Sequence, residues 1–104
     1  MFDAYPNPPK FRHEPSDQAY YSPLFDQISL PLKSQFATEL GYAETKAHEG
    51  IHSTGHSTRL NRFDDKSNPH EAYAREELVA EIGAAIVMQR LGLEPDMQRM
   101  ADYV

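Results

Sequence analysis

The sequence lacks cysteine altogether, so it can hold no disulfide, no thiol nucleophile and no metal site built on thiolates. It also lacks an apolar run near the roughly 20 residues of a membrane span, and no basic-then-apolar signal opens it. Basic residues are few, because 10 Lys and Arg face 16 Asp and Glu, which leaves a net charge of −6. We therefore expect a cytoplasmic protein with no membrane contact, and no nucleic-acid binding by this domain alone.

The length and the distribution of proline indicate one small domain behind an extended arm. The chain has 104 residues, of which 39% are hydrophobic, and this is enough for one compact core. Six of the eight prolines lie in the first 31 residues. Because proline has a fixed φ and no amide hydrogen, residues 1–17 are predicted to form an extended, proline-rich arm rather than a helix or an interior strand. The folded domain is expected to span residues 18–104.

Hydrophobic periodicity predicts two short strands followed by two helices, which together make a small α+β domain. The strands are expected at residues 19–23 and 25–31, where prolines limit their length. The first helix is expected to run from about residue 36 to residue 54, with Gly55 as a stop in the left-handed conformation. The second helix is expected to run from about residue 70 to residue 91.

The second predicted helix has clear ends and an unusual middle. The Asn-Pro step at residues 68–69 is typical of a helix start, and Gly92 is typical of a helix end. Between residues 78 and 88 the one polar side chain is that of Glu81. A helix so apolar around its circumference is predicted to be buried on all faces. An ionised carboxylate there needs a partner, because burying it alone would cost several kcal/mol.

His48-Glu49-Gly50-Ile51-His52 is an H-E-x-x-H string inside the first predicted helix. Four residues make about one helical turn, so the rings of His48 and His52 point the same way and can share one cation. Glu49 would then lie beside the metal without completing its shell, where it can take a proton from a metal-bound water. The alternative is a solvent-facing helix that carries the two histidines by chance. The helical context favours the metal site, and we expect the metal to be zinc.

A catalytic zinc site needs a third protein ligand, and the sequence offers three possible sources. His56 lies one turn beyond His52, but a rigid helix would spread the three histidines over about 12 Å. His56 is therefore a candidate for contact with substrate, or a surface histidine. The metzincin pattern would require a histidine at position 58, where this chain has Thr58. The remaining source is a carboxylate of the second helix.

Glu77 and Glu81 lie one turn apart in the second predicted helix and face a common neighbour. Alanines on the same stripe would let that face approach another helix closely, and the histidine helix is the expected neighbour. We assign Glu77 as the third ligand, and Glu81 as the acceptor of a hydrogen bond from the outer nitrogen of a ligand histidine. The reverse assignment stays open, as does a plain salt bridge involving Arg75. Glu76, on a stripe that looks more exposed, is the weaker candidate.

The order of these motifs resembles the zincin-like metallopeptidase domain of ArdC-type antirestriction proteins, which also occurs in polyvalent proteins of phages and plasmids. The resemblance covers about residues 18–92. It rests on five segments: 20–23, 28–31, 48–56, 59–62 and 73–85. It implies a zinc-dependent, gluzincin-type fold, in which a short β-sheet packs on the H-E-x-x-H helix and a second helix carries the glutamates.

The resemblance also implies the roles of the site residues. His48 and His52 would be zinc ligands, Glu49 would be the catalytic base, and a glutamate of the segment 76–81 would be the third ligand. This chain departs from the family in two respects. The ArdC-type proteins carry an amino-terminal single-stranded-DNA-binding domain that nothing here matches, and their second helix continues into a longer helical segment. Here only residues 93–100 precede a similar ending, so we expect a partner chain or a second copy to supply the missing part, or a reduced domain.

The predicted function is zinc-dependent hydrolysis of peptide bonds, through a metal-bound water activated by Glu49, in a protein of mobile-element origin. A peptide or protein substrate would pair with the strand around Ile28. A further donor should stabilise the oxyanion. The candidates for this donor are His56, Tyr73, Tyr42 and Tyr103. The alternative is a non-catalytic, zinc-stabilised interaction or antirestriction module, which would have no use for a base at Glu49.

Overall fold

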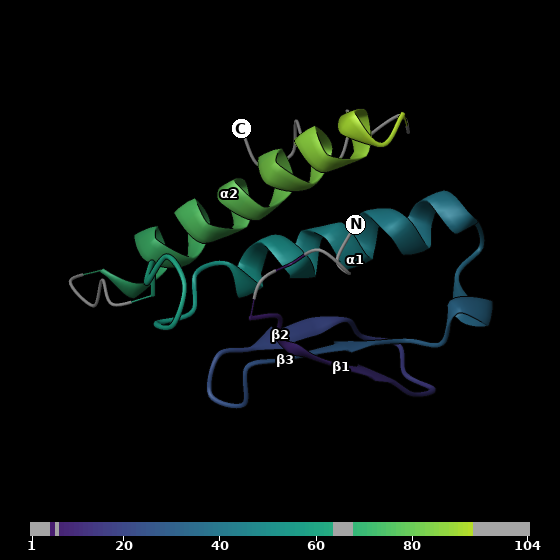
Figure 1. Cartoon of the computed structure of the whole chain (residues 1–104), viewed down its shortest axis with the longest axis horizontal. Helices are drawn as coiled ribbons and strands as arrows, with labels where there is room; N and C mark the ends of the chain where they lie inside the picture. The colour runs from purple at the N-terminus through teal and green to yellow at the C-terminus, as the bar shows by residue number, and fades with distance from the viewer. Residues whose placement is uncertain (1–4, 6, 64–67, 93–104) are drawn as a thin grey trace.

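The computed structural model describes residues 5, 7–63 and 68–92 of the chain. The elements in this part of the chain are β1 (Lys10–His13), β2 (Tyr20–Ser22), β3 (Gln27–Leu30), the 3₁₀ turn η2 (Lys33–Gln35), α1 (Glu39–Ser53) and α2 (Pro69–Arg90). Figure 1 shows three layers, with α1 lying between the sheet below it and α2 above it. The small α+β domain expected from the sequence is confirmed.

The sheet has three strands in the order β1-β3-β2, so β3 is central and β1 and β2 are its edges. β1 runs parallel to β3, with Phe11 opposite Ile28, and β2 runs antiparallel to β3, with Tyr21 opposite the same residue. The sequence analysis did not predict β1, whose Lys-Phe-Arg-His sequence contains a single large apolar residue. Because an edge strand tolerates charged residues and nearby prolines, it leaves little hydrophobic signal.

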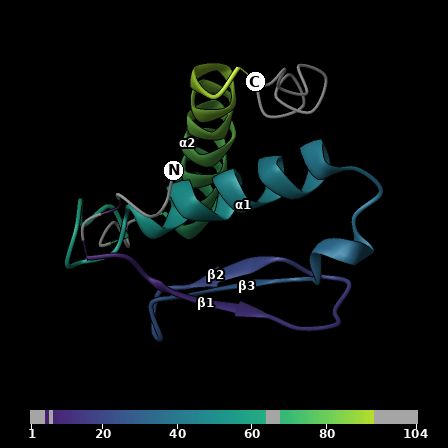
Figure 2. The same ribbon diagram turned by 45° about the vertical axis from the view of Figure 1, so that its right-hand side comes forward.

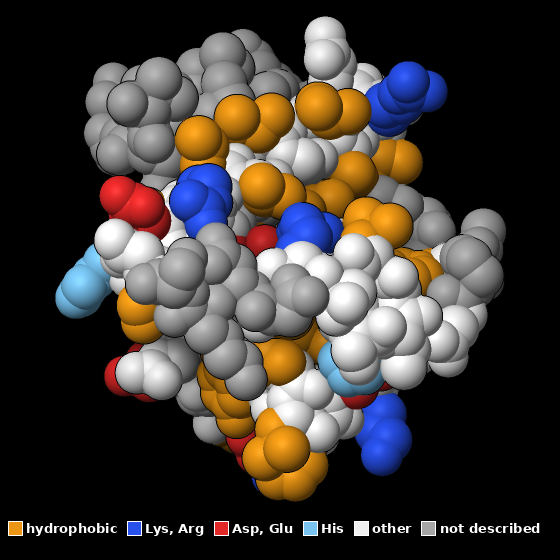
Figure 3. All heavy atoms as spheres, turned by 90° about the vertical axis from the view of Figure 1, so that its left-hand side faces the viewer, with side chains coloured by type: hydrophobic (Ala, Val, Ile, Leu, Met, Phe, Trp, Pro, Cys, Tyr) orange, Lys and Arg blue, Asp and Glu red, His pale blue; other side chains and the backbone are white. Residues whose placement is uncertain are grey.

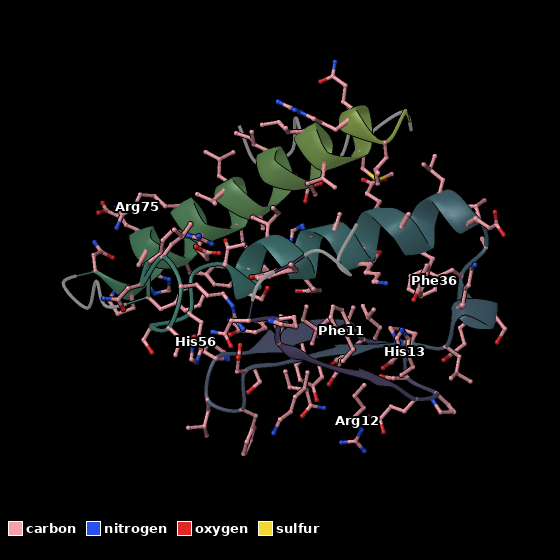
Figure 4. All side chains as sticks on the ribbon, viewed as in Figure 1. Phe11, Arg12, His13, Phe36, His56 and Arg75 are labelled. Atoms are coloured by element: carbon pink, nitrogen blue, oxygen red, sulfur yellow. The ribbon has the colours of Figure 1, made fainter. Side chains whose placement is uncertain are left out.

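The sheet turns one face to α1 and the other face outward. Figure 4 shows Phe11 on the side of β1 that faces α1 and Arg12 on the opposite side. On β3, Ile28 and Leu30 are 0% and 1% exposed. Burying an apolar side chain of this size contributes about 1.5–3 kcal/mol. The apolar face of the sheet therefore forms the floor on which α1 packs.

The two helices cross at close range. Figure 2 shows α2 crossing α1 rather than running alongside it for its whole length. Ala80 and Ala84 of α2 are buried, and a Cβ atom built on Gly83 would lie 3.0 Å from the side chain of Ile51 on α1. These small residues allow the close approach that the alanine stripe predicted. As a result, the C-terminal part of α1 lies against the middle of α2.

Each helix has a side-chain cap at its start. The hydroxyl of Thr38 accepts a hydrogen bond from the backbone of Gly41 at 2.9 Å, so α1 begins at Glu39 rather than near residue 36. The side chain of Asn68 caps α2, as predicted from its Asn-Pro step. The predicted end of α2 is also confirmed, because Gly92 has a positive φ of 76° just beyond the last turn.

Gly55 has a different role from the one predicted. Among the glycines that the structure describes, Gly92 has a positive φ and Gly55 does not, so Gly55 is not a left-handed stop. A Cβ atom built on Gly55 would lie 2.6 Å from the ring of Phe63 and 3.1 Å from the guanidinium of Arg62. A glycine is needed at this position because two side chains of the following loop pack directly against its backbone.

The prediction that the middle of α2 is buried on all faces is wrong. Val79, Ile82 and Ile86 are 39%, 41% and 53% exposed. Among the described elements α2 is the outermost layer, and it packs against α1 on one side. Figure 3 shows hydrophobic side chains gathered in the upper part of one face, at the level of α2. No helix within the described residues is long and apolar enough to cross a membrane.

Candidate metal centre

The H-E-x-x-H string occupies the last turns of α1, as the helical periodicity predicted. His48 and Glu49 are 6% and 7% exposed, and the ring of His52 is partly buried beside them. The two imidazoles meet edge to face, and the Nε2 atoms of His48 and His52 lie 3.2 Å apart. The two nitrogens therefore point at a common position, as the spacing of four residues requires.

Glu77 of α2 completes this group from the other helix. Its Oε2 atom lies 3.3 Å from Nε2 of His48, and its Oε1 atom lies 3.0 Å from Nε2 of His52. The Glu77 side chain is 16% exposed, so it is largely enclosed by the two helices. Figure 4 shows Arg75, by contrast, on the side of α2 that faces away from α1.

The donor atoms fit a divalent cation. Ligands about 2.0–2.1 Å from a tetrahedral zinc ion lie about 3.3 Å from one another. The observed separations between the two Nε2 atoms and the carboxylate oxygens of Glu77 are 3.0–3.3 Å. Nitrogen and oxygen donors of this kind suit zinc, manganese and similar ions. His48, Glu49 and His52 also offer ligand atoms that all lie within 4.8 Å of one another, which places a second carboxylate, that of Glu49, beside the centre.

Each histidine has its own carboxylate on the outer side of the ring. Nδ1 of His48 lies 2.8 Å from Oε2 of Glu81, and Nδ1 of His52 lies 2.7 Å from Oε2 of Glu76. A carboxylate can only accept a hydrogen bond, so each Nδ1 carries a proton and donates it. Each Nε2 atom then carries a lone pair that can bind a metal ion, and both rings are fixed in orientation.

The structure places Glu81 at His48, in the position that the sequence analysis assigned to it. The partner of His52, Glu76, was considered only as a weaker ligand candidate, and its hydrogen bond to His52 was not foreseen. A signal was present, because Glu76 and Glu77 are adjacent and therefore point about 100° apart around α2. Adjacent glutamates can thus reach two different nitrogens of the same ring, one on each side of it.

Charges around His52 shift the pKa values of both partners of its outer hydrogen bond toward their charged forms. Burial raises the pKa of Glu76, but hydrogen bonds from His52 and Arg62 outweigh it and hold the pKa below its ordinary value. Burial likewise lowers the pKa of His52, but the hydrogen bond to Glu76 and the charges of Glu49 and Glu77 outweigh it and raise this pKa in the metal-free chain. A positive charge is therefore favoured at this centre.

A cleft of about 520 Å³ opens over the centre. Besides the histidines and glutamates described above, its walls come from β2, the segments around it and both helices. These wall residues are Ala19, Tyr20, Tyr21, Pro23, Thr45 and Tyr73. β2 is an edge strand of the sheet, so the cleft runs along the side of the sheet that has no further strand among the described residues.

The residues predicted to contact substrate lie in different places. Tyr73 lines the cleft and is 68% exposed. His56 is on the loop after α1, where Nδ1 lies 2.8 Å from the hydroxyl of Thr58, and it does not line the cleft (Figure 4). Tyr42 hydrogen-bonds His13 at 2.9 Å and also does not line the cleft. Tyr103 lies outside the described residues.

The strand around Ile28 is not available for a substrate peptide. It is β3, and both of its edges are already paired, with β1 on one side and β2 on the other. The expectation that a peptide pairs with this strand is therefore wrong. The sequence pattern could not show this, because the short and polar β1 that covers one edge left no hydrophobic signal.

The three layers and the centre between the two helices define a zincin-like domain. The chain belongs to the zincin-like metallopeptidase family, whose model matches residues 7–104. The family resemblance predicted from the ordered motifs is thus confirmed, and with it the zincin-like fold.

Three relatives of the chain are larger proteins, one from a plasmid and two from Escherichia coli. The antirestriction ArdC protein from the R388 plasmid has a manganese-bound crystal structure that superposes with a TM-score of 0.79 at 42% identity, over 91% of this chain and 36% of that one. Its metal-free structure gives a TM-score of 0.77. Two Escherichia coli proteins named DNA primase TraC are each 44% identical over 88% and 89% of this chain. The chain spans only 6% and 9% of their lengths.

Proposed function

We propose that the chain is a zinc-dependent peptidase of mobile-element origin. The observation that supports this most directly is the convergence of His48, His52 and Glu77 on one position, with Glu49 beside it, at the base of an open cleft. A centre that served stability alone would have no need of a cleft or of a second carboxylate at Glu49. We propose that residues 18–104 carry the activity, and that residues 1–17 form an arm whose β1 segment joins the sheet.

His48, His52 and Glu77 would hold the metal ion, and their mixed nitrogen and oxygen donors favour zinc over manganese in intrinsic affinity. When bound, the ion lowers the pKa of a water ligand towards about 7 and polarises a carbonyl oxygen. Glu81 and Glu76 keep the two rings in the orientation and protonation state that this binding requires.

Glu49 is proposed as the general base and then the general acid of the reaction. Its carboxylate would take the proton of the attacking water and then donate it to the nitrogen of the leaving amine. The peptide would lie along β2, because an edge strand can add an extended peptide through backbone hydrogen bonds. Tyr73, at the mouth of the cleft, is the remaining described candidate for a hydrogen-bond donor to the oxyanion.

The second candidate function is a non-catalytic interaction or antirestriction module that uses its metal ion for stability. It is favoured by the names of the relatives, which are an antirestriction protein and DNA primases rather than peptidases. In this case the cleft would bind a partner protein without cutting it, and Glu49 would be dispensable.

The two candidates are separated by the variant Glu49→Gln. The wild type and the variant are loaded with zinc, their metal content is measured by mass spectrometry, and both are incubated with a peptide library whose products are sequenced. If the protein is a peptidase, both proteins should contain the same amount of zinc and the wild type alone should cleave peptides. Cleavage by neither protein, at full zinc content, would instead support the interaction module.

A further inference from the structure

Arg62, in the loop that follows α1, contacts both helices beside the centre. Its Nε and Nη2 atoms lie 2.9 and 3.0 Å from the two carboxylate oxygens of Glu76. Its Nη1 and Nη2 atoms donate to the hydroxyl of Thr54 at 2.8 Å and to the backbone oxygen of Ile51 at 3.0 Å. One guanidinium thus ties the C-terminal end of α1 to the first turns of α2.

The loop is shaped to hold this guanidinium in place. The backbone of Arg62 donates to the oxygen of Gly55 at 2.9 Å, which folds the loop back on the end of α1. Gly55 leaves room for the guanidinium, since a Cβ atom there would lie 3.1 Å from Nη2. Asn61, just before Arg62, has a positive φ of 52°, a left-handed conformation that asparagine adopts more readily than most residues.

The two outer carboxylates of the centre differ in burial. The Glu81 side chain is 3% exposed. The Glu76 side chain is 17% exposed and receives two hydrogen bonds from Arg62. A two-pronged hydrogen bond from a guanidinium fixes both the position and the plane of a carboxylate. The carboxylate oriented in this way accepts a hydrogen bond from Nδ1 of His52 at 2.7 Å.

We propose that Arg62 is a positioning residue of the metal centre, which acts through Glu76 to hold His52 with its proton on Nδ1 and its Nε2 atom directed at the metal. The inference rests on the proposed function for the presence of the metal, but the chain Arg62–Glu76–His52 is a property of the protein without metal. Residues 54–63, the described part of the loop that follows α1, are then part of the centre, although none of them is a proposed ligand.

Arg59 is the matched control, because it is an arginine of the same loop with an equally full set of partners. It binds both oxygens of Asp26 at 2.8 and 2.9 Å and the backbone oxygens of Asn7 and Ser53. None of these partners is a residue of the metal centre. A variant of Arg59 therefore measures how the loss of a loop arginine changes zinc affinity in general. A variant of Arg62 measures that change together with any effect on His52.

The test compares Arg62→Gln, Glu76→Gln, their double variant and Arg59→Gln. Zinc affinity is measured by competition with a chromophoric chelator, and the Nδ1 proton of His52 is followed by NMR in the metal-free protein. We expect Arg62→Gln and Glu76→Gln each to weaken zinc binding by about 10–100-fold. The double variant should bind zinc as tightly as the single variant with the lower affinity, because both substitutions break the same series of hydrogen bonds from Arg62 through Glu76 to His52. The Nδ1 proton signal should be lost in both, and Arg59→Gln should keep the signal and the affinity.

The inference is overturned if Arg62→Gln binds zinc as tightly as the wild type and keeps the Nδ1 signal, or if the two losses multiply in the double variant. If Arg62→Gln does not fold, Arg62→Lys is measured instead, and wild-type affinity with an unchanged signal would contradict a role for the two-pronged contact. If the wild type itself binds no zinc, the proposed function fails, and the NMR comparison in the metal-free protein still decides whether Arg62 positions His52.

Discussion

Oε1 of Glu77 lies 3.0 Å from Nε2 of His52, on the side of the ring opposite the hydrogen bond between Nδ1 and Glu76. The ring of His52 is therefore held between Glu76 and Glu77, two neighbouring residues of one helix. A neutral ring has a single N–H proton to share between these two carboxylates. A neutral imidazole can donate from only one nitrogen. The contact between Nε2 and Glu77 therefore needs either a second proton or a cation, and a shared metal ion satisfies it together with the same contact at His48.

We expect Glu77 and Glu81 to differ in their effect on metal binding. Glu77→Ala removes a ligand and should abolish most zinc binding, whereas Glu81→Ala removes the support of His48 and should weaken binding by about 10–100-fold. Chelator competition measures both, with Glu71→Ala, an exposed position of the first turn of α2, as the control. The opposite ranking of the two variants would exchange their roles.

Gly55→Ala should destabilise the fold and weaken the centre together. The new methyl group would lie 2.6 Å from the ring of Phe63, which is closer than Cβ contacts allow, so Phe63 and Arg62 must move. Overpacking of this kind costs about 1–3 kcal/mol. Gly83→Ala is the matched control: its contacts with Ile51 are 3.0 Å, and alanine gains roughly 1 kcal/mol in helix propensity. Urea denaturation should show a clearly larger loss for Gly55→Ala, and equal losses would rule out this role for Gly55.

The ion pair between Asp26 and Arg59 should make stability depend on pH in acid. Hydrogen bonds from Arg59 lower the pKa of Asp26 below its ordinary value of 3.8 in the folded protein. The stabilisation is therefore fully present above pH 3.8 and is lost as the pH falls through the lowered pKa. Asp26→Asn should cost about 1–3 kcal/mol at pH 7, since it weakens a charged hydrogen bond to a largely buried arginine.

Denaturation of wild type and Asp26→Asn at pH 7, 5 and 3 checks this expectation. The difference between the two proteins should be constant from pH 7 to 5 and should shrink at pH 3. Glu14→Gln, in the exposed ion pair with Arg12, should change stability by less than about 1 kcal/mol throughout. A difference for Asp26→Asn that is the same at every pH would contradict the assignment.

The sequence predicted those parts of the centre that depend on helical periodicity alone. His48, Glu49 and His52 are related by one turn of a single helix, and Glu77 and Glu81 by one turn of another, so their directions follow from the spacing. The structure brings these residues together at the crossing of the two helices. The ligand roles of these residues stay predictions until a metal is bound.

The contacts that the sequence did not predict depend on how separate segments meet. Whether Glu76 faces His52 is set by the crossing of α1 and α2, and whether Arg62 reaches Glu76 is set by the path of a loop. Neither leaves a periodic signal. The exposure of one side of α2 was not predicted for a related reason. An apolar side chain such as Ile86 favours burial, but the sequence does not show whether another surface covers it.

The most direct test of the centre is anomalous diffraction at the zinc edge from crystals of the zinc-loaded protein. The structure predicts one strong peak between the two helices, about 2.0–2.1 Å from Nε2 of His48, Nε2 of His52 and an oxygen of Glu77. The carboxylate of Glu49 should lie next to the zinc ion without coordinating it. A peak at another place, or a metal held by Glu49 or Glu81 in place of Glu77, would contradict the proposed centre and the peptidase built on it.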